Sequence, residues 1–119
     1  LKSAVTTAVF PGKKGWKSNF PQESVPGDDV TINFSAFRIG NIVMAGISGE
    51  MFTEIGMNVK KRSTRNTTIM THCNGASGYI CTDTSYGEGG YEPKVSHLMP
   101  GSETEFENIL VELIDDLNQ

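Results

Sequence analysis

Residues 30–50 read VTINFSAFRIGNIVMAGISGE and carry the clearest structural signal in the chain. Apolar and polar side chains alternate from Val30 towards Ile39, which is the period of a half-buried strand. Residues 42–47, IVMAGI, are apolar throughout, as is typical of a strand that is buried more completely. The Gly40-Asn41 pair between the two segments favours a tight turn, so the sequence predicts a β-hairpin.

Two helices are predicted downstream of the hairpin. The first is expected to open at Ser48-Gly49-Glu50 and to run to about Arg62, with a narrow apolar stripe of Phe52, Ile55 and Val59. The second follows Pro100-Gly101, and Ser102 with Glu105 forms the pattern of a capping box at its start. Its wide apolar face consists of Phe106, Ile109, Leu110, Leu113, Ile114 and Leu117.

The remaining segments complete a small mixed fold. Residues 1–10 favour a strand, residues 11–29 a long loop, residues 67–73 a strand, and residues 74–90 a Gly-rich turn region. Trp16 and Phe20 either pin the long loop to the surface or line a substrate groove. The predicted order is β-β-α-β-loop-α. The predicted fold class is α/β of the mixed α+β kind, a small mixed β-sheet with two main helices on one face. We expect one domain, with an N-terminal strand and loop (residues 1–29) followed by an α/β part (residues 30–119).

Composition excludes several classes of protein. A net charge of -4 without a basic cluster beyond Lys60-Lys61-Arg62 argues against nucleic-acid binding, which needs many cationic groups. No apolar run approaches the ~18 residues that span a bilayer. The start at Leu1, without Met or a signal-peptide pattern, is interpreted as a cut inside a longer polypeptide. Cys73 and Cys81 match neither a CxxC motif nor a zinc ribbon, so they form either a disulfide or two buried free thiols.

Three side chains near predicted strand ends and Gly-rich turns are candidates for chemistry. Glu50 directly follows the buried strand, and α/β proteins place their sites at the carboxyl ends of such strands. A helix-start carboxylate that complements the helix dipole would have the same sequence context. Tyr79 and Tyr91 follow glycines that allow unusual backbone turns, although either ring could simply pack on the core.

The order and spacing of these segments resemble a known enzyme family. The segments are Ile42–Glu50, Cys73-Asn74, Gly78–Thr82, Gly90-Tyr91-Glu92 and Ser96. Together they are similar to the last third of the catalytic domain in the neutral/alkaline non-lysosomal ceramidase family. The resemblance covers roughly residues 40 to 115. Ser48, where Pro is common in the family, and Gly89-Gly90 depart from its well-characterised members and are more like uncharacterised bacterial ones.

The resemblance implies a zinc-dependent amide hydrolase. The family cleaves the amide of N-acylsphingosine with one zinc ion, held by two histidines from earlier in the domain and by a glutamate and a tyrosine from this part. Carried over by position, Glu50 and Tyr79 would bind the metal, and the Tyr91 hydroxyl would be catalytic by stabilising the oxyanion. Asn74, His72 and Ser96 would either contact the substrate or contact the zinc ligands and hold them in place. Neither His72 nor His97, which is expected in a surface loop, matches the family's zinc histidines.

These implications make the chain the C-terminal segment of a larger hydrolase, inactive alone because it lacks the two histidines. Zinc is expected in the full-length protein, acting on a lipid-like N-acyl amide. The expected partner is the upstream part of the same polypeptide or a second copy, packed on an open edge or bare face of the sheet. A secreted or periplasmic location follows from the resemblance, and a cytoplasmic one stays open. Two alternatives remain: a non-catalytic ceramidase-like binding or assembly domain, and an unrelated α/β domain that buries both tyrosines for packing.

Overall fold

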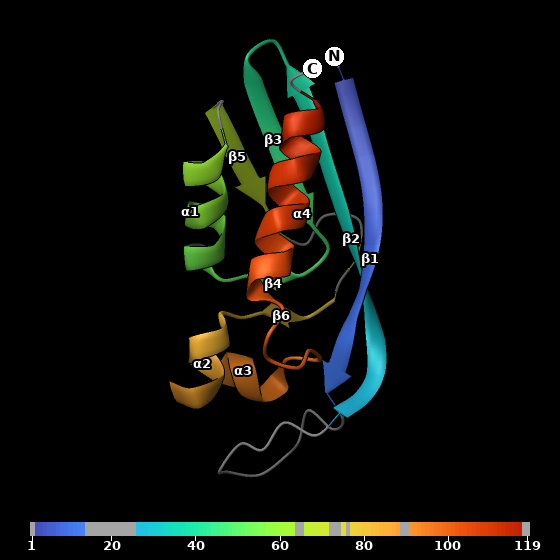
Figure 1. The fold of residues 1–119 in the computed structure, drawn as a ribbon, viewed down its shortest axis with the longest axis vertical. Coiled ribbons are helices and arrows are strands. Elements are labelled where there is room, and N and C mark those ends of the chain that lie inside the picture. The colour runs from blue at the N-terminus through green and yellow to red at the C-terminus, as the bar shows by residue number, and fades with distance from the viewer. Residues whose placement is uncertain are drawn as a thin grey trace.

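The protein contains two β-sheets and four helices in the part of the chain that the structure describes. This computed structural model describes residues 2–13, 26–63, 66–71, 75, 77–88 and 91–117. The main sheet has the strand order β1-β2-β3-β5 (Figure 1), formed by β1 (Lys2–Lys13), β2 (Pro26–Ile39), β3 (Ile42–Ile47) and β5 (Asn66–Met70). A smaller parallel sheet pairs β4 (Glu50–Met51) with β6 (Tyr79–Ile80). The helices are α1 (Thr53–Arg62), α2 (Asp83–Glu88), α3 (Tyr91–Val95) and α4 (Glu103–Asp116).

The predicted hairpin and fold class are confirmed. Strands β2 and β3 pair antiparallel from Phe34 opposite Ile47 to Ile39 opposite Ile42. Gly40 in the turn has a φ of 61°, a left-handed conformation that glycine adopts without a steric penalty. Strand β1 pairs antiparallel with β2, whereas β3 and β5 are parallel, so the sheet is mixed as expected.

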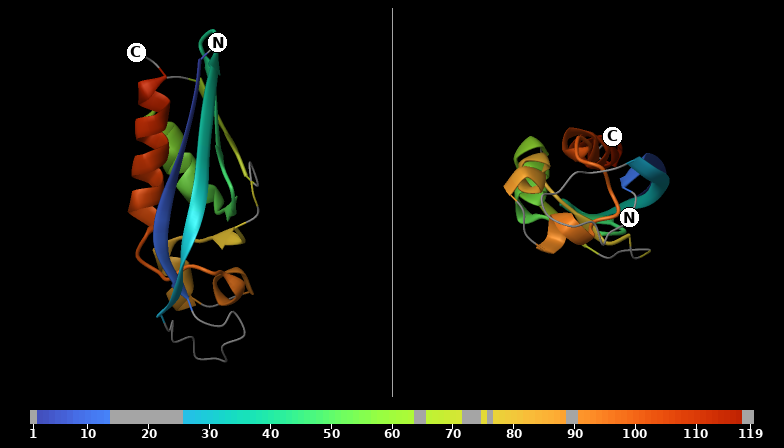
Figure 2. Two further views of the ribbon diagram at one scale, coloured as in Figure 1. Left: turned by 90° about the vertical axis from the view of Figure 1, so that its right-hand side faces the viewer. Right: turned by 90° about the horizontal axis from the view of Figure 1, so that it is seen from below.

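The core lies between the main sheet and the two longer helices. Figure 2 shows α1 and α4 on the same side of the sheet. Phe10 of β1, Phe34 of β2 and Phe106 of α4 meet there, with ring centroids 4.3 to 6.4 Å apart and at most 2% of each residue exposed. Such aromatic packing contributes to stability beyond the area it buries. This cluster joins β1, the middle of the sheet and α4 into one unit.

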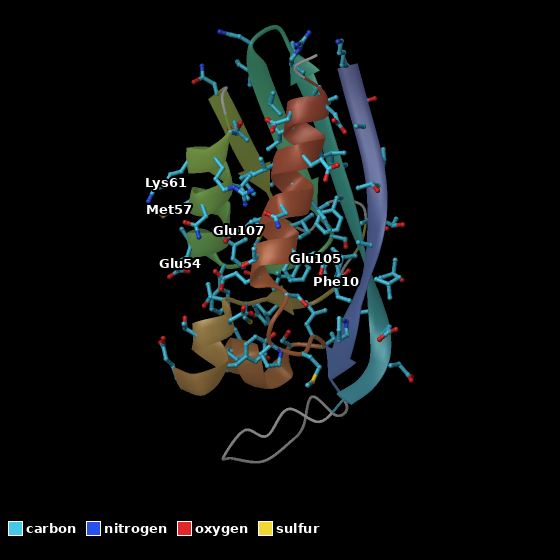
Figure 3. All side chains as sticks on the ribbon, viewed as in Figure 1. Phe10, Glu54, Met57, Lys61, Glu105 and Glu107 are labelled. Carbon is cyan, nitrogen blue, oxygen red and sulfur yellow. The ribbon has the colours of Figure 1, made fainter. Side chains whose placement is uncertain are left out.

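A polar contact joins the two covering helices. Glu107 of α4 is 8% exposed and accepts a hydrogen bond of 3.0 Å from Nδ2 of Asn58 in α1. Figure 3 shows Glu107 on the part of α4 that faces α1, whereas Glu54, Met57 and Lys61 extend from the outer side of α1. The buried carboxylate therefore has a partner, as buried polar groups require.

The prediction that Glu50 opens a helix is wrong. Glu50 belongs to β4, and α1 begins three residues later at Thr53. The Glu50 N–H donates to the carbonyl oxygen of Gly78 at 2.8 Å, and the Phe52 N–H donates to that of Ile80 at 2.9 Å. The segment is extended because its backbone pairs with a strand that is distant in sequence, which local helical periodicity cannot reveal.

The predicted long loops are also too long. Strand β1 continues through Pro11 to Lys13, and β2 begins at Pro26, so both ends of the predicted loop 11–29 are strand. Trp16 and Phe20 lie outside the described residues. The predicted turn region 74–90 contains β6 and α2. Helix α2 is positioned by contacts across the chain, since the Asp83 N–H donates to a Glu103 carboxylate oxygen at 2.7 Å and the Gly101 N–H donates to Asp83 Oδ1 at 2.8 Å.

The C-terminal helix is confirmed, but its predicted capping box is not. Phe106, Leu110, Leu113, Ile114 and Leu117 are buried and Ile109 is partly buried. Ser102 is the N-cap residue, yet its side chain makes no cap hydrogen bond. Its φ of -101° and ψ of 0° differ from the extended conformation that aims an N-cap oxygen at the first turn.

We expect Phe106→Ala to lower the free energy of unfolding by about 3–5 kcal/mol, because it removes the ring that α4 contributes to the aromatic cluster and leaves a cavity. Urea unfolding monitored by circular dichroism measures this change. Met57→Ala is the matched control, since Met57 is 50% exposed on α1 and its replacement should change stability by less than about 0.5 kcal/mol. Equal losses in both variants would contradict this description of the core.

Candidate functional site

The β4–β6 pairing places Glu50 beside Tyr79. These residues are directly opposite each other in the parallel ladder, and Met51 is opposite Ile80. Adjacent strands lie ~4.8 Å apart, and side chains at one register position project to the same face. Two of the residues that the sequence analysis selected, far apart in the chain, are therefore neighbours in the fold.

Two glycines allow this close approach. A Cβ atom at Gly49 would lie 2.7 Å from the carbonyl oxygen of Gly78 and 2.6 Å from Cδ1 of Ile80, so a larger residue would push the strands apart. Gly78 has a φ of 79°, which side-chain-bearing residues rarely adopt. Gly49 thus admits a neighbouring backbone at close range, and this neighbour is the segment that carries Tyr79.

Tyr91 completes a cluster with this pair. It is the first residue of α3 and is 64% exposed. Its ring meets the ring of Tyr79 edge-on, with centroids 6.1 Å apart and an interplanar angle of 82°. This edge-to-face contact is a favoured aromatic geometry, and it places the Tyr91 ring next to Tyr79.

An acidic hollow of about 320 Å³ adjoins the ladder. It is lined by Glu50, Met51, Phe52, Thr53, Glu54, Tyr79 and Glu92. Burial, followed by the charge of the Glu50 carboxylate, raises the pKa of the Tyr79 hydroxyl, and Tyr91 and Glu92 contribute in the same direction. The concentration of carboxylates gives the hollow a negative potential, which favours a cation.

Glu54 and Glu92 were not selected from the sequence. Glu54 lies in the first turn of α1 and Glu92 follows Tyr91 in α3, so each resembles an ordinary surface charge near a helix start. In the sequence, Glu54 is close to Glu50 and Glu92 is next to Tyr91, and this proximity to candidate residues was the only hint that they belong to the site. The fold brings both glutamates to one hollow.

A buried hydroxyl network fixes the backbone of Tyr79. The Ser96 hydroxyl, whose residue is fully buried, donates to the Tyr79 carbonyl oxygen at 2.8 Å and accepts from the Leu98 N–H at 3.2 Å. The Tyr86 hydroxyl donates to the Leu98 carbonyl oxygen at 3.1 Å and lies 3.3 Å from Ser96 Oγ. Burial raises the pKa of Tyr86 to about 12. These contacts tie β6 to the segment between α3 and α4.

A second hydroxyl network holds the other side of the ladder. Ser48, fully buried, accepts the Asn33 N–H at 3.0 Å through Oγ, and the same oxygen lies 2.7 Å from Ser77 Oγ. The Ser77 N–H donates to the Ser48 carbonyl oxygen at 2.7 Å. The serine at position 48 therefore links β2, the end of β3 and the segment before β6.

The other predicted site residues have varied outcomes. His72, Cys73 and Asn74 lie outside the described residues, so their roles stay predictions. His97 is exposed, as expected for a surface position. Cys81 is buried, with 3% of the residue exposed. Among the residues that the structure describes, no group of three or more His, Cys, Asp or Glu side chains has a geometry that could hold a metal ion.

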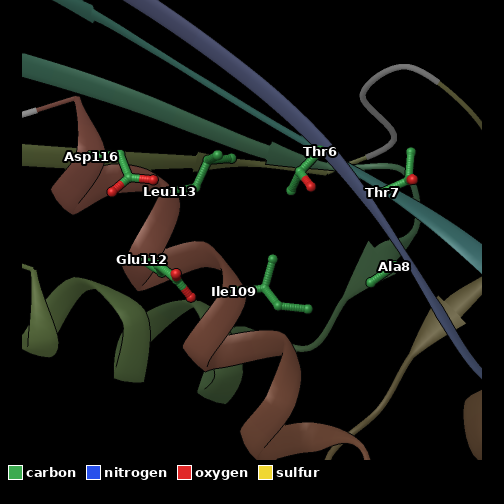
Figure 4. Close-up of a pocket in the computed structure, with 7 residues that line it drawn as sticks. All are labelled: Thr6, Thr7, Ala8, Ile109, Glu112, Leu113 and Asp116. Carbon is green, nitrogen blue, oxygen red and sulfur yellow. The ribbon is translucent and has the colours of Figure 1, made fainter.

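A second hollow of about 240 Å³ lies between β1 and α4 (Figure 4). Residues 6–8 of β1 and Ile109, Glu112, Leu113 and Asp116 of α4 line it. It contains two carboxylates but no tyrosine or histidine, and neither element contributes to the β4–β6 ladder. The candidate site is therefore the hollow beside Glu50 and Tyr79.

No helix within the described ranges is long and apolar enough to cross a membrane.

The raised pKa of Tyr86 predicts a loss of stability at alkaline pH. The folded-state value of about 12 exceeds the ordinary 10.0, so the neutral phenol stabilises the fold fully below pH 10 and less as the pH rises towards 12. Tyr86→Phe should flatten this decline in urea midpoints measured from pH 8 upwards, with a loss of about 1 kcal/mol at neutral pH for the missing hydrogen bond. Tyr91→Phe, at an exposed position, is the control and should leave the decline in place. An unchanged decline in Tyr86→Phe would refute the assignment.

The sequence and the fold were compared with those of known proteins. No family model and no curated protein sequence matches the chain. Among solved structures, it is similar to neutral ceramidase from Pseudomonas aeruginosa and to a ceramidase complexed with C2, each with a TM-score of 0.65 and 20% identity. The matches cover 73% and 74% of this chain but 15% of each ceramidase chain. The resemblance drawn from the sequence is thus confirmed at the level of the fold: this chain is similar in structure to part of a neutral ceramidase.

Proposed function

We propose that this chain supplies part of the active site of a ceramidase-type amide hydrolase, with Glu50 and Tyr79 as two oxygen ligands of one zinc ion. The observation that carries the proposal is the register of the β4–β6 ladder, which sets these residues opposite each other beside an acidic hollow. The fold's similarity to ceramidases supplies the class of reaction and a lipid-like N-acyl amide as the class of substrate.

The chemistry of the donor set fits zinc in part. Carboxylate oxygen binds zinc at ~2.0–2.2 Å, and a carboxylate and a phenol at opposed positions of two neighbouring strands can approach one ion. Catalytic zinc sites have about three protein ligands, commonly including histidine. The described residues supply two, so the remaining ligands must come from elsewhere, and the chain alone should be inactive. When bound, the ion would lower the pKa of a water molecule and polarise the amide carbonyl.

The chain's own groups have separable roles. The exposed phenol of Tyr91, held edge-on by Tyr79, is the proposed donor to the oxyanion that develops on the amide carbonyl. Ser96 is fully buried with its hydroxyl on the Tyr79 carbonyl, which favours support of Tyr79 over contact with the substrate. By resemblance, His72 and Asn74 would contact the substrate or support the ligands.

A non-catalytic assembly domain is the second candidate. The observation that favours it is a set of exposed apolar side chains on the main sheet, namely Val5, Val9, Ile39 and Ile42. The two candidates differ in whether metal is required, and metal content therefore separates them.

Zinc content of the full-length protein tests the ligand assignment. We expect one zinc per chain by elemental analysis after dialysis, lost in Glu50→Gln and in Tyr79→Phe, because each removes one of a small number of ligands. Glu54→Gln is the matched control: it removes a carboxylate from the same hollow and should retain zinc. A full-length protein without zinc would exclude the hydrolase proposal, and equal losses in all three variants would exclude this choice of ligands.

Tyr91→Phe separates the oxyanion donor from the metal ligands. In the full-length protein, it should lower kcat for hydrolysis of a short-chain N-acyl amide by about 10²–10³-fold, the effect of removing one oxyanion donor. Zinc content should stay at the wild-type level. A loss of zinc with Tyr91→Phe would make Tyr91 a ligand instead, and an unchanged kcat would remove it from the reaction.

A further inference from the structure

We propose that a pair of serines, Ser48 and Ser77, positions the two proposed zinc ligands, and that loss of either hydroxyl weakens zinc binding by about 10–100-fold. The inference rests on the proposed function and adds two residues to it. Neither serine lines the acidic hollow, so both act on the site through the backbone and are positioning residues. Ser48 departs from the resembled family and Ser77 lies outside the segments that carry the resemblance, so the resemblance gives neither residue a role.

Each serine precedes one of the proposed ligands by two residues. Ser48 comes two residues before Glu50. Ser77 comes two residues before Tyr79, which is opposite Glu50 in the β4–β6 ladder. The two serines contact each other twice, because their Oγ atoms lie 2.7 Å apart and the Ser77 N–H donates to the Ser48 carbonyl oxygen at 2.7 Å. This double contact, which we call the serine clamp, therefore joins the same two segments that carry the ligands, immediately upstream of them.

The regular ladder does not reach this end of the pairing. Strands β4 and β6 begin at the ligands themselves, at Glu50 and Tyr79. Gly49 and Gly78 separate the ligands from the serine clamp, and neither has a side chain that could hold the strands together. Gly78 also has a φ of 79°, so the backbone leaves the extended conformation between Ser77 and Tyr79. The serine clamp supplies a contact on the upstream side, where the ladder supplies none.

The main sheet anchors the serine clamp through Ser48. This residue is fully buried, its Oγ accepts the Asn33 N–H at 3.0 Å, and its own N–H donates to the Asn33 carbonyl oxygen at 3.0 Å. Asn33 belongs to β2, which pairs with both β1 and β3. Ser48 is therefore the fixed half of the clamp, and Ser77, which is only partly buried, is the half that is held.

A metal site is sensitive to a contact of this kind. Protein ligands have to stay within about 0.5 Å of their productive positions, and replacing the residues that support them typically changes metal affinity by about 10–100-fold. A single hydrogen bond between hydroxyls is a small part of the stability of a whole domain. Loss of the serine clamp should therefore lower zinc affinity much more than it lowers overall stability. This contrast distinguishes a positioning role from a merely structural one.

The zinc dissociation constant of the full-length protein, measured by competition with a chelator, tests the proposal. Ser77→Ala removes one hydroxyl of the serine clamp and leaves the contacts between Ser48 and Asn33, so it should fold and bind zinc about 10–100-fold more weakly than the wild type. Ser48→Ala should bind zinc at least as weakly. Adding Ser77→Ala to Ser48→Ala should weaken binding no further, because the two hydroxyls act as one unit.

Ser63→Ala is the matched control. The Ser63 hydroxyl lies 2.7 Å from Thr67 Oγ1, the same distance as in the serine clamp, and Ser63 is also partly buried. Ser63 follows the last residue of α1, whereas the acidic hollow borders the first residues of that helix, and the 10 residues of α1 extend over ~15 Å. Ser63→Ala should therefore retain the wild-type zinc affinity while losing a comparable hydrogen bond. Ser77→Thr, which keeps the hydroxyl, should also bind zinc like the wild type.

Hydrogen exchange measured by mass spectrometry shows whether the effect runs through the ladder. Peptides that contain the Glu50 and Phe52 amides should exchange faster in Ser77→Ala than in the wild type or in Ser63→Ala, because these amides form the β4–β6 hydrogen bonds. The inference is overturned if a zinc-binding wild type and Ser77→Ala have equal affinities, if Ser63→Ala loses as much affinity, or if exchange at these amides is unchanged. A wild-type protein without zinc would refute the proposed function, and the zinc part of the inference with it, whereas the exchange rates would still show whether the serine clamp holds the ladder.

Discussion

The short parallel pairing of β4 with β6 is the constraint on which the candidate site depends. Two backbone hydrogen bonds, from Glu50 to Gly78 and from Phe52 to Ile80, fix the register that sets Glu50 opposite Tyr79. The pairing requires glycine at position 49, since a Cβ there would collide with the Gly78 carbonyl oxygen at 2.7 Å. A slip of one residue would send the two side chains to opposite faces and separate the oxygen donors.

Strands of two residues are not stable by themselves, so the ladder must be held from outside. On one side, Ser48 at the end of β3 connects to Asn33 and Ser77 through its hydroxyl and backbone. On the other side, Ser96 holds the Tyr79 carbonyl and is itself surrounded by Leu98 and Tyr86. The position of the site residues is thus determined by buried hydroxyls next to the site, which have no contact with the acidic hollow.

The sequence predicted the parts of the fold that have a strong local period and failed where distant segments pair. Residues 30–47 and the helix after Ser102 carry clear periodicity, and both are present. Glu50 was placed in a helix because the partner of β4 is nearly thirty residues away and leaves no local pattern. Glu50 and Tyr79 were selected together through a family resemblance, whereas Glu54 and Glu92 were missed because isolated glutamates are ordinary surface residues. The cap at Ser102 failed because side-chain identity does not fix the backbone angles that aim a hydroxyl.

The Glu50–Tyr79 pair is incomplete as a metal site, because it offers fewer protein ligands than a catalytic zinc requires. The acidic hollow beside the pair is bordered by Thr53 and Glu54 at the start of α1. The β4–β6 ladder already sets the relative positions of the two proposed ligands, whereas the remaining ligands have to come from other residues.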